Sequence, residues 1–338
     1  MGLVEELRRE RSLGGPARRP VRSRVIEVVF RSEARRSICS ATARLLRGHV
    51  PLRDRLLRWA LTPSSWEALA RAHADIVIST GSSSALCNIH LSRRTLARSV
   101  VIMDPGLPQG HFTAMIVPYH DKIRHGKNVY RTVAALSALA PAEVVRSGAE
   151  LRRRLGLEGR AVIGFLVGGD VRGGQGLDRD GLVKTVDALL QHLRTTKSVV
   201  LITTSRRTPD WVAEILKSRF SNKEHCPLLV IVTESNPPGT MAAILGAADQ
   251  VLVTAESVSM ISEAVRASKP VLALHPSDSI QPKPKHRRFL QSLGARYPLI
   301  ESGPSGLEQA LSNLSRRRAE PASDPDRADL SAAAKAIL

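Results

Sequence analysis

The residues that most clearly suggest chemistry lie within residues 254–263, where an apolar run gives way to hydroxyl and carboxylate side chains. The pattern predicts a strand end that leads into a helix, whose first amides would favour an anion such as a diphosphate. On that helix Glu263 follows Ser259 by four residues and Glu256 by seven, so the three would share one side. A carboxylate placed there can accept hydrogen bonds from both hydroxyls of a ribose. A serine N-cap with acidic residues that complement the helix dipole explains the same pattern without a ligand.

Two further segments could hold phosphate at strand ends. Gly168 and Gly169 follow an apolar run, and glycine lets backbone amides approach a phosphate closely. Their surroundings match neither G-x-G-x-x-G nor a Walker A loop, and an ordinary tight turn is the alternative. Ser205, Arg206 and Arg207 follow the next apolar run and combine a hydroxyl with two bidentate donors just before a helix. A capped helix with solvated arginines is the alternative for that segment.

His120 and Asp121 are the candidates for acid–base catalysis. They follow the apolar run 114–118, and a histidine beside a carboxylate can remove the proton from an acceptor hydroxyl. The alternative is a loop histidine whose hydrogen bonds are satisfied within the fold. No H-x-x-x-H, C-x-x-C or G-x-S-x-G pattern occurs in the sequence, so neither a metal site nor a serine hydrolase is expected.

Composition narrows the class of protein. With 338 residues, of which 43% are hydrophobic and 24% charged, the chain is long enough for two globular domains. Its apolar runs have the length of strands and fall short of the roughly 20 residues that a transmembrane helix needs. Three widely spaced cysteines and the lack of a secretory leader indicate a reducing compartment, so we expect a cytoplasmic protein.

The net charge of +19 is the most unusual global feature, and arginine supplies 40 of the 50 basic residues. Such a charge attracts the phosphates of a nucleotide, a nucleic acid or an anionic membrane face. A GC-rich genome explains the arginine content without any function. Because aromatic residues make up only 3% of the chain, few rings could stack on bases, and no specific nucleic-acid partner is expected. Peripheral contact with the inner face of a membrane stays open as a hypothesis.

Alternating strand and helix patterns position these residues. In the first half, short β-branched runs predict strands at 25–30, 75–79, 99–103 and 114–118, with helices at about 52–72 and 83–96. In the second half, strands are predicted at 161–167, 198–204, 228–233, 250–254 and 270–274. Helices are predicted at about 180–196, from residue 209 onward, at 240–247 and at 258–267. Continuous apolar strands are typical of parallel sheets that are covered on both faces.

These patterns indicate two domains. We expect an acceptor-side domain at 1–140, a linker at 141–158, a nucleotide-sugar-binding domain at 159–315 and a loose tail at 316–338 with a short C-terminal helix. Two facing parallel-sheet domains would place a cleft at the carboxyl ends of their strands, where the candidate residues lie.

Several segments resemble the elongated-mitochondria (Elm-type) mitochondrial fission family and its bacterial relatives. They are Ser-Arg-Arg-Thr-Pro at 205–209, Glu-Ser-Asn-Pro at 234–237, Glu-Ser-Val-Ser-Met-Ile-Ser-Glu-Ala at 256–264, Pro-Tyr-His-Asp at 118–121 and Asn-Val-Tyr-Arg-Thr at 128–132. The resemblance covers roughly residues 70–310. It implies a GT-B-like fold, and the bacterial members are regarded as glycosyltransferases. The segment that ends in Ser262-Glu263 is also similar to the donor site of MurG-type glycosyltransferases, which assigns the ribose-binding role to Glu263.

The sequence departs from that family at three places. The acidic residue before Ser-Val-Ser-Met is Glu256, where the family often has Asp. Asp170 and Arg172 follow the paired glycines, where relatives tend to continue Pro-Ser-Lys, so the arginine would have to offset the aspartate beside a diphosphate. Relatives also begin with a strand and an Asp-Gly-x-Pro-Gly-His-type loop that has no match here, so either the start is truncated or the first strand is lost. The sequence therefore leaves undecided which residues would form the acceptor side of the cleft.

We therefore expect an α/β protein with a GT-B-like fold, in which two doubly wound Rossmann-like domains face each other across a cleft. The expected reaction moves a sugar from a nucleotide-sugar donor to a lipid-linked or cell-envelope-type glycan acceptor, with no metal and no separate cofactor. His120 and Asp121 would be catalytic. The nucleotide sugar would be bound by Gly168, Gly169, Ser205, Arg206, Arg207, Glu256, Ser257, Ser259, Met260 and Glu263. A non-catalytic, membrane-associated adaptor of the mitochondrial-fission type is the competing class.

Overall fold

The chain folds into two compact units, which we call the central unit and the terminal unit. The central unit comprises residues 133–325, and the terminal unit comprises residues 3–132 together with 326–338. The structure is a computed structural model that describes residues 3–13, 22–42, 50–121, 123–137, 139–170, 176–220, 224–279, 283–315 and 326–338.

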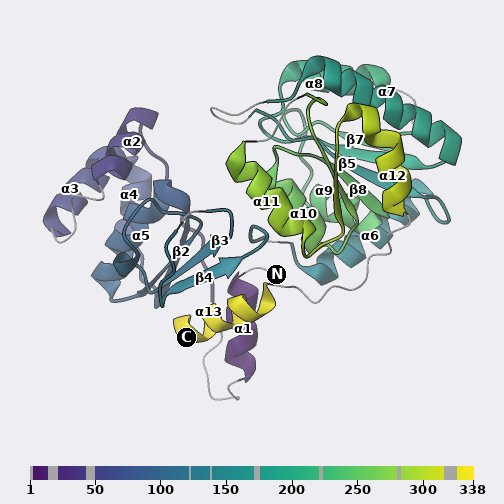
Figure 1. Cartoon of the computed structure of the whole chain (residues 1–338). Helices are drawn as coiled ribbons and strands as arrows, with labels where there is room; N and C mark the ends of the chain where they lie inside the picture. Colours follow the sequence, from purple (N-terminus) through teal and green to yellow (C-terminus); the bar gives the residue numbers. More distant parts are fainter. Residues whose placement is uncertain are drawn as a thin grey trace. The chain divides into compact units, whose positions relative to one another are not determined.

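The central unit contains a six-stranded, wholly parallel sheet in the order β10-β9-β8-β5-β6-β7 (Figure 1). Its strands are β5 (Val162–Leu166), β6 (Val199–Thr203), β7 (Leu228–Val230), β8 (Gln250–Thr254), β9 (Val271–Leu274) and β10 (Leu299–Ser302). Its helices are α6 (Pro141–Leu155), α7 (Arg179–Thr196), α8 (Asp210–Arg219), α9 (Thr240–Ala247), α10 (Val258–Arg266), α11 (Pro284–Gly294) and α12 (Leu307–Ser315).

Side chains of the continuous apolar strands of this sheet pack into two hydrophobic cores, one on each face. In β5, Val162 and Leu166 belong to one buried cluster, whereas Ile163 and Phe165 belong to the other. Since side chains alternate along a strand, these clusters lie on opposite faces of the sheet. Helices α6, α9, α10 and α11 supply side chains to the first cluster, and α7, α8 and α12 to the second. The central unit is therefore a three-layer helix–sheet–helix fold.

The terminal unit contains a four-stranded parallel sheet in the order β1-β2-β3-β4. Its strands are β1 (Ile76–Thr80), β2 (Arg98–Ile102), β3 (Ala114–Pro118) and β4 (Val129–Thr132). Its helices are α1 (Leu3–Leu13), α2 (Glu33–Thr42), α3 (Val50–Ala60), α4 (Pro63–Arg71), α5 (Gly81–Thr95) and α13 (Arg327–Ile337). The α/β class with two parallel sheets is thus confirmed.

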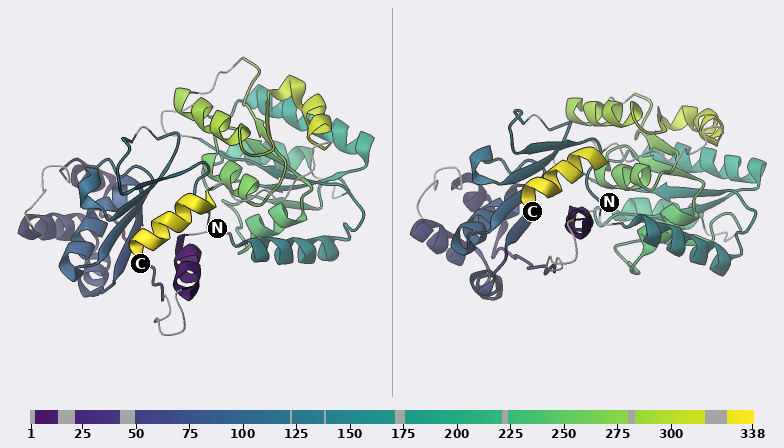
Figure 2. Two further views of the ribbon diagram at one scale, coloured as in Figure 1. Left: turned by 60° about the horizontal axis from the view of Figure 1, so that its bottom comes forward. Right: turned by 90° about the horizontal axis from the view of Figure 1, so that it is seen from below.

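The C-terminal helix α13 belongs to the terminal unit, where it packs against α1 (Figure 2). The Ser331 hydroxyl donates a hydrogen bond of 2.6 Å to the Glu10 carboxylate, and Arg98 of β2 donates to the backbone carbonyl of Ile337. The predicted short C-terminal helix is therefore present. Residues 316–325 of the expected tail lie outside the described residues.

The expected linker at 141–158 is wrong, because most of it forms α6, which packs on α9 inside the central unit. The two helices touch at Gly148 and Gly246, where a Cβ on either residue would overlap the backbone of the other helix. The Ala-Pro-Ala start of the segment suggested a break, but proline is well suited to the first turn of a helix. The units instead change at residues 132–133 and 325–326.

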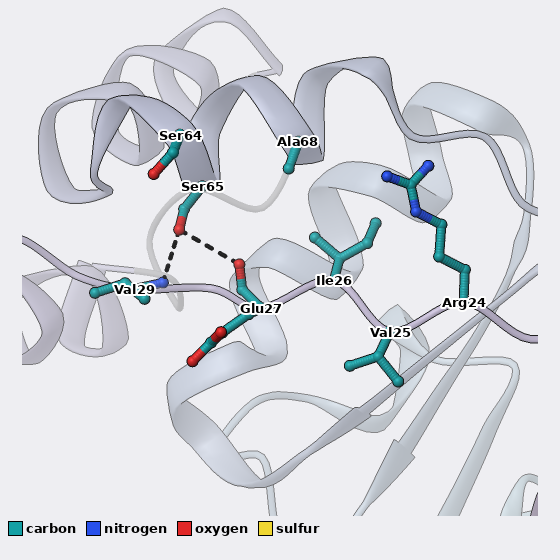
Figure 3. Close-up of a pocket in the computed structure, with 8 residues that line it drawn as sticks. All are labelled: Arg24, Val25, Ile26, Glu27, Val29, Ser64, Ser65 and Ala68. Atoms are coloured by element: carbon teal, nitrogen blue, oxygen red, sulfur yellow. Dashed lines mark hydrogen bonds between the residues drawn. The ribbon is translucent and has the colours of Figure 1, made fainter.

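Residues 25–30, predicted as a strand, form an extended segment with one antiparallel bridge between Phe30 and Leu61. Figure 3 shows how α4 holds this segment: the Val29 amide donates to the Ser65 hydroxyl at 3.0 Å, and that hydroxyl lies 3.3 Å from the Glu27 carbonyl. Ladder bonds to a neighbouring strand are thus replaced here by side-chain bonds. The eight residues drawn line a hollow of 280 Å³.

The predicted helix at 52–72 is divided into α3 and α4. The break falls at Leu61 and Thr62, and Thr62 caps α4 by accepting a hydrogen bond of 3.4 Å from the Ser65 amide. Pro63 then occupies the first turn, where its missing N–H costs nothing. No helix in the described part of the chain is long and apolar enough to span a membrane.

Candidate functional site

The strand order of the central unit creates a topological switch point between β5 and β8. From β5 the chain moves outward through β6 and β7 on one side, and through β8, β9 and β10 on the other. Two neighbouring parallel strands whose following connections diverge leave a crevice at their carboxyl ends, where open α/β sheets bind ligands. Gly168 and Glu256, both predicted from the sequence, follow these two strands.

A short chain of hydrogen bonds joins the two strand ends. The Gly168 amide donates to the Thr254 hydroxyl at 2.8 Å, and that hydroxyl donates to Oε1 of Glu256, also at 2.8 Å. A Cβ on Gly168 would overlap the Glu256 carboxylate, so only glycine allows this approach. Thr254 was not among the predicted site residues, although its place at a strand end, two residues before Glu256, was the available signal.

The segment after β6 is held against the paired glycines by Thr208. The Thr208 hydroxyl donates to the Gly168 carbonyl and accepts a hydrogen bond of 2.8 Å from the Ser205 amide. The Ser205 hydroxyl accepts from the Arg207 amide at 3.1 Å, which closes a tight turn. The Asp170 amide donates to the Arg207 carbonyl at 3.1 Å. The two predicted phosphate segments are therefore brought together by the fold.

Arg206 and Arg207 are exposed in that turn, whereas Ser205 is half-buried. Both guanidinium groups are thus carried by a backbone that is fixed to the strand ends. The neighbouring helix α8 begins after Pro209 without a side-chain cap, and Asp210 in its first turn already complements its dipole. Arg172, the residue expected to offset Asp170, lies outside the described residues.

Glu256 is in an unusual electrostatic setting for a carboxylate. Burial raises the pKa of Glu256 to about 7, although the Thr254 hydroxyl, the Gly169 amide and the charge of Arg207 act in the opposite direction. Its Oε2 atom is buried and has no hydrogen-bond partner among the described residues. A carboxyl group with such a pKa is half-protonated near neutral pH, so it can donate as well as accept a hydrogen bond.

Helix α10 begins at Val258, two residues after Glu256, so Glu256 does not lie on the helix and cannot share a helix side with Glu263. Glu256 therefore precedes the helix and turns toward Gly168, and only Ser259 has helical spacing to Glu263. Ser257 is the N-cap residue, but its side chain makes no cap hydrogen bond to the helix among the described residues. The first turn of α10 thus presents amides without a side-chain cap at the edge that also carries Gly168.

The remaining predicted residues of α10 differ in exposure. Ser259 is exposed at the helix start, and Glu263 is half-buried one turn further along, where burial raises its pKa. The Met260 side chain is buried in the core beneath the sheet, so only its backbone could serve a ligand. The buried Ser262 hydroxyl accepts a hydrogen bond of 3.0 Å from the Ala135 amide and so ties α10 to the start of the central unit.

Sequence reasoning missed His286, which lies on α11. Its Nε2 atom is 3.2 Å from the backbone carbonyl of Glu256, which places the imidazole beside the β8 end. The helix that carries it was not predicted, but the run Lys283-Pro-Lys-His-Arg-Arg288 is a signal for a basic surface. Since this run surrounds His286 with cations, α11 adds positive charge next to the candidate anion site.

His120 and Asp121 lie in the terminal unit, directly after β3. Both side chains are buried, and the His120 Nε2 atom is 3.8 Å from Oδ1 of Asp121. Arg131 of β4 donates to the Asp121 carbonyl at 3.1 Å and lies over the ring of Tyr119. The predicted pair is therefore close together at the carboxyl edge of its sheet, and its catalytic role stays a prediction. The described residues contain no cluster of His, Cys, Asp and Glu side chains suited to a metal ion.

The sequence matches the family described as Mitochondrial fission ELM1 over residues 1–313. The chain belongs to this family. A protein of Rickettsia prowazekii (strain Madrid E), Uncharacterized protein RP120, is 23% identical over 255 residues, which are 65% of this chain and 69% of that protein. The resemblance found in the sequence is thus confirmed.

Solved structures share the fold at low identity. The S. aureus MnaA–UDP structure is 11% identical, with a TM-score of 0.50, and the match covers 86% of this chain and 77% of that one. A structure of Anabaena Alr3699/HepE in complex with UDP and glucose is 14% identical, with a TM-score of 0.43 and coverage of 93% and 92%. The MnaA match concerns the fold alone, and it agrees with the GT-B class expected from the sequence.

Proposed function

We propose that the central unit binds the nucleoside diphosphate of a nucleotide sugar at the carboxyl ends of β5 and β8, and that the protein transfers the sugar to an acceptor hydroxyl. The observation that carries the proposal is the switch point itself. There the paired glycines, the Ser205–Thr208 turn and the start of α10 converge around Glu256. The GT-B-like fold and the UDP named in the MnaA structure support the same reading.

Each residue has a role in this proposal. The amides of Ser259 and Met260 and the guanidinium groups of Arg206 and Arg207 would bind the diphosphate, while the Gly169 amide faces the Glu256 carboxyl group. Their donors would also stabilise the charge that develops on the leaving diphosphate, which is the largest contribution such a site can make to catalysis. Gly168 would keep the approach open, since a larger residue would fill the space against Glu256.

Glu263 would accept hydrogen bonds from the ribose hydroxyls, one turn into the helix whose start holds the phosphates. Its half-buried position and raised pKa fit a carboxylate that gains from two hydroxyl donors on binding. His120, supported by Asp121, would take the proton of the acceptor hydroxyl. The resemblance points to a lipid-linked or envelope glycan as acceptor, and the sparse cysteine content to a cytoplasmic location.

The test is thermal unfolding of the wild type and Glu263→Ala in the presence of UDP-, GDP-, CMP- and dTDP-sugars at two salt concentrations. A ligand at about 100 times its Kd adds about 2.7 kcal/mol to the free energy of unfolding, which a melting curve resolves readily. Glu214→Ala is the matched control, because Glu214 is an exposed glutamate on α8 of the same unit.

We expect one nucleotide family to raise the Tm of the wild type and of Glu214→Ala, and this shift to be lost in Glu263→Ala. A shift that survives in Glu263→Ala would refute the ribose role. A shift that all phosphates share, and that salt removes, would refute the donor site and leave only a general attraction between charges.

Family membership supports a second candidate, a non-catalytic adaptor at a membrane. A fold does not fix a function, and the same architecture can serve recruitment in one relative and catalysis in another. Turnover of a nucleotide sugar separates the two: release of the free nucleotide supports the transferase, whereas capture of a fission-type partner without turnover supports the adaptor.

A further inference from the structure

Exposed apolar side chains are concentrated in one part of the terminal unit. Of the large hydrophobic residues that are exposed in the described chain, five lie between residues 25 and 59. They are Val25, Val29, Ile38, Leu52 and Trp59. Leu52 and Trp59 are 49% and 42% exposed, which is unusual for a leucine and a tryptophan of one short helix. A gathering of this kind marks a surface that contacts something other than water.

Hydrogen bonds and a cation–π contact hold the start of α2 against the end of α3, close to these exposed residues. The Arg31 amide donates to the Ala60 carbonyl at 2.9 Å, and the Thr62 amide donates to the Val29 carbonyl at 3.0 Å. The Arg35 guanidinium lies 4.7 Å from the centre of the Trp59 ring and also donates to the Trp59 carbonyl at 2.7 Å. The first turn of α2 is therefore fixed against the last turn of α3.

Helical spacing arranges the exposed side chains in stripes. On α3, Leu52, Arg55 and Trp59 are three and then four residues apart, so they share one side of the helix. On α2, Ile38 follows Arg35 by three residues, so it lies one turn from the guanidinium that touches Trp59. We call the surface made by Arg35, Ile38, Leu52, Arg55 and Trp59 the α2–α3 surface. It alternates large apolar side chains with arginines.

The surface lies in a strongly basic part of the chain. Residues 22–59 contain ten arginines against Glu27, Glu33 and Asp54. Glu33 pairs with Arg36 of its own helix. The Asp54 carboxylate, which is 45% exposed, lies 3.0 Å from Nδ1 of the buried His90. Ten arginines against three acidic residues leave this part of the chain with an excess of positive charge.

We propose that the α2–α3 surface binds an anionic lipid bilayer. Exposed leucine and tryptophan with interleaved arginines are the side chains that interfacial helices use: the apolar groups enter the headgroup region while the guanidinium groups bind lipid phosphates. Two copies of so basic a surface would repel each other, which disfavours a homodimer through this face. A nucleic acid would use the arginines but would leave Leu52 and Ile38 without a function. The inference does not depend on the donor site of the central unit.

The test is co-sedimentation of the full chain with vesicles of phosphatidylcholine, with or without phosphatidylglycerol. We expect binding to the phosphatidylglycerol vesicles and about a tenfold loss of affinity in Leu52→Glu/Trp59→Glu, because both apolar contacts are lost and two negative charges are added. Val145→Glu is the matched control, since Val145 is 71% exposed on α6 of the central unit. The Tm of each variant shows that it is folded.

A second measurement reports insertion directly. Brominated lipids quench tryptophan fluorescence on contact, so we expect quenching in the wild type and much less in Trp59→Phe, which keeps an apolar ring. Equal binding of the wild type and the double variant would overturn the proposal, as would equal binding to both kinds of vesicle. Binding without quenching would also overturn it, because the arginines would then adsorb to the membrane without insertion of Trp59. Capture of an acidic protein by this surface, with no vesicle binding, would assign it to a different partner.

Discussion

Replacing Glu256 by glutamine should change how the free energy of unfolding depends on pH. The pKa of Glu256 is raised by burial to about 7, against an ordinary value of 4.5. A carboxyl group whose folded-state pKa is raised favours folding least when it is ionised, so its cost grows as the pH rises from 4.5 to 7 and is constant above that. The difference between the two pKa values lowers the free energy of unfolding by about 3 kcal/mol at pH 8 and by about 1 kcal/mol at pH 5.

Glutamine keeps an oxygen that can accept the Thr254 hydroxyl but never ionises, so the pH-dependent cost disappears. Its amide nitrogen takes the buried place of Oε2, and the cost of burying it there is the same at every pH. The informative quantity is therefore how the difference in free energy of unfolding between the variant and the wild type changes with pH. From pH 5 to pH 8, the variant should gain about 2–3 kcal/mol relative to the wild type.

The assay is thermal unfolding at pH 5, 6, 7 and 8, with Glu214→Gln, an exposed site on α8, as the control. For a unit of this size the relative gain corresponds to about 5–10 °C in Tm. A difference that stays flat over this range would refute the reasoning, because Glu256 would then titrate as an ordinary carboxylate. A difference of opposite sign would show that the Gly169 amide and Arg207 outweigh burial and hold Glu256 ionised.

Three further predictions follow from the packing. Gly246→Ala should lower the free energy of unfolding of the central unit by about 1–3 kcal/mol, since its Cβ would overlap the Val144 carbonyl of α6; an unchanged denaturation midpoint would contradict this contact. Burial lowers the pKa of His90 despite the nearby Asp54, so the unfolded chain gains a proton more easily than the folded one. The free energy of unfolding should therefore fall as the pH drops below 6.5. His90→Gln should flatten that dependence in thermal melts between pH 7.5 and pH 5. Burial raises the thiol pKa of Cys87 to about 12, so this thiol should react with a disulfide reagent at pH 8 only after unfolding, and fast labelling of the native protein would contradict its burial.

The sequence was most informative where a residue pattern has one physical solution. The strands at Ala114–Pro118 and Gln250–Thr254 and the helix at Thr240–Ala247 lie as predicted, because apolar runs bounded by turn residues leave little choice. The parallel arrangement of the sheets followed from strands that are apolar on both faces. Strands β4 and β10 were missed because each is short, partly exposed and contains a charged residue, Arg131 in one and Glu301 in the other.

The site was only partly predictable for a different reason. The candidate residues after β5, β6 and β8 do meet at one edge, since carboxyl ends of parallel strands must. The role of Glu256 as a buried neighbour of Gly168 could not be read from spacing, because it depends on where α10 begins. The imidazole of His286 reaches the same edge from a helix thirty residues later in the chain, and no local pattern reports such a contact.

The division of the chain also has a consequence for its synthesis. The described residues of the central unit lie in one stretch of the chain, from 133 to 315, so the core of this unit can be completed before α13 is made. The terminal unit, although its sheet is made first, must wait for α13 before α1 and the Arg98 side chain gain their partners. A nascent chain that has released this stretch but not yet α13 therefore carries a finished central unit and an unfinished terminal one.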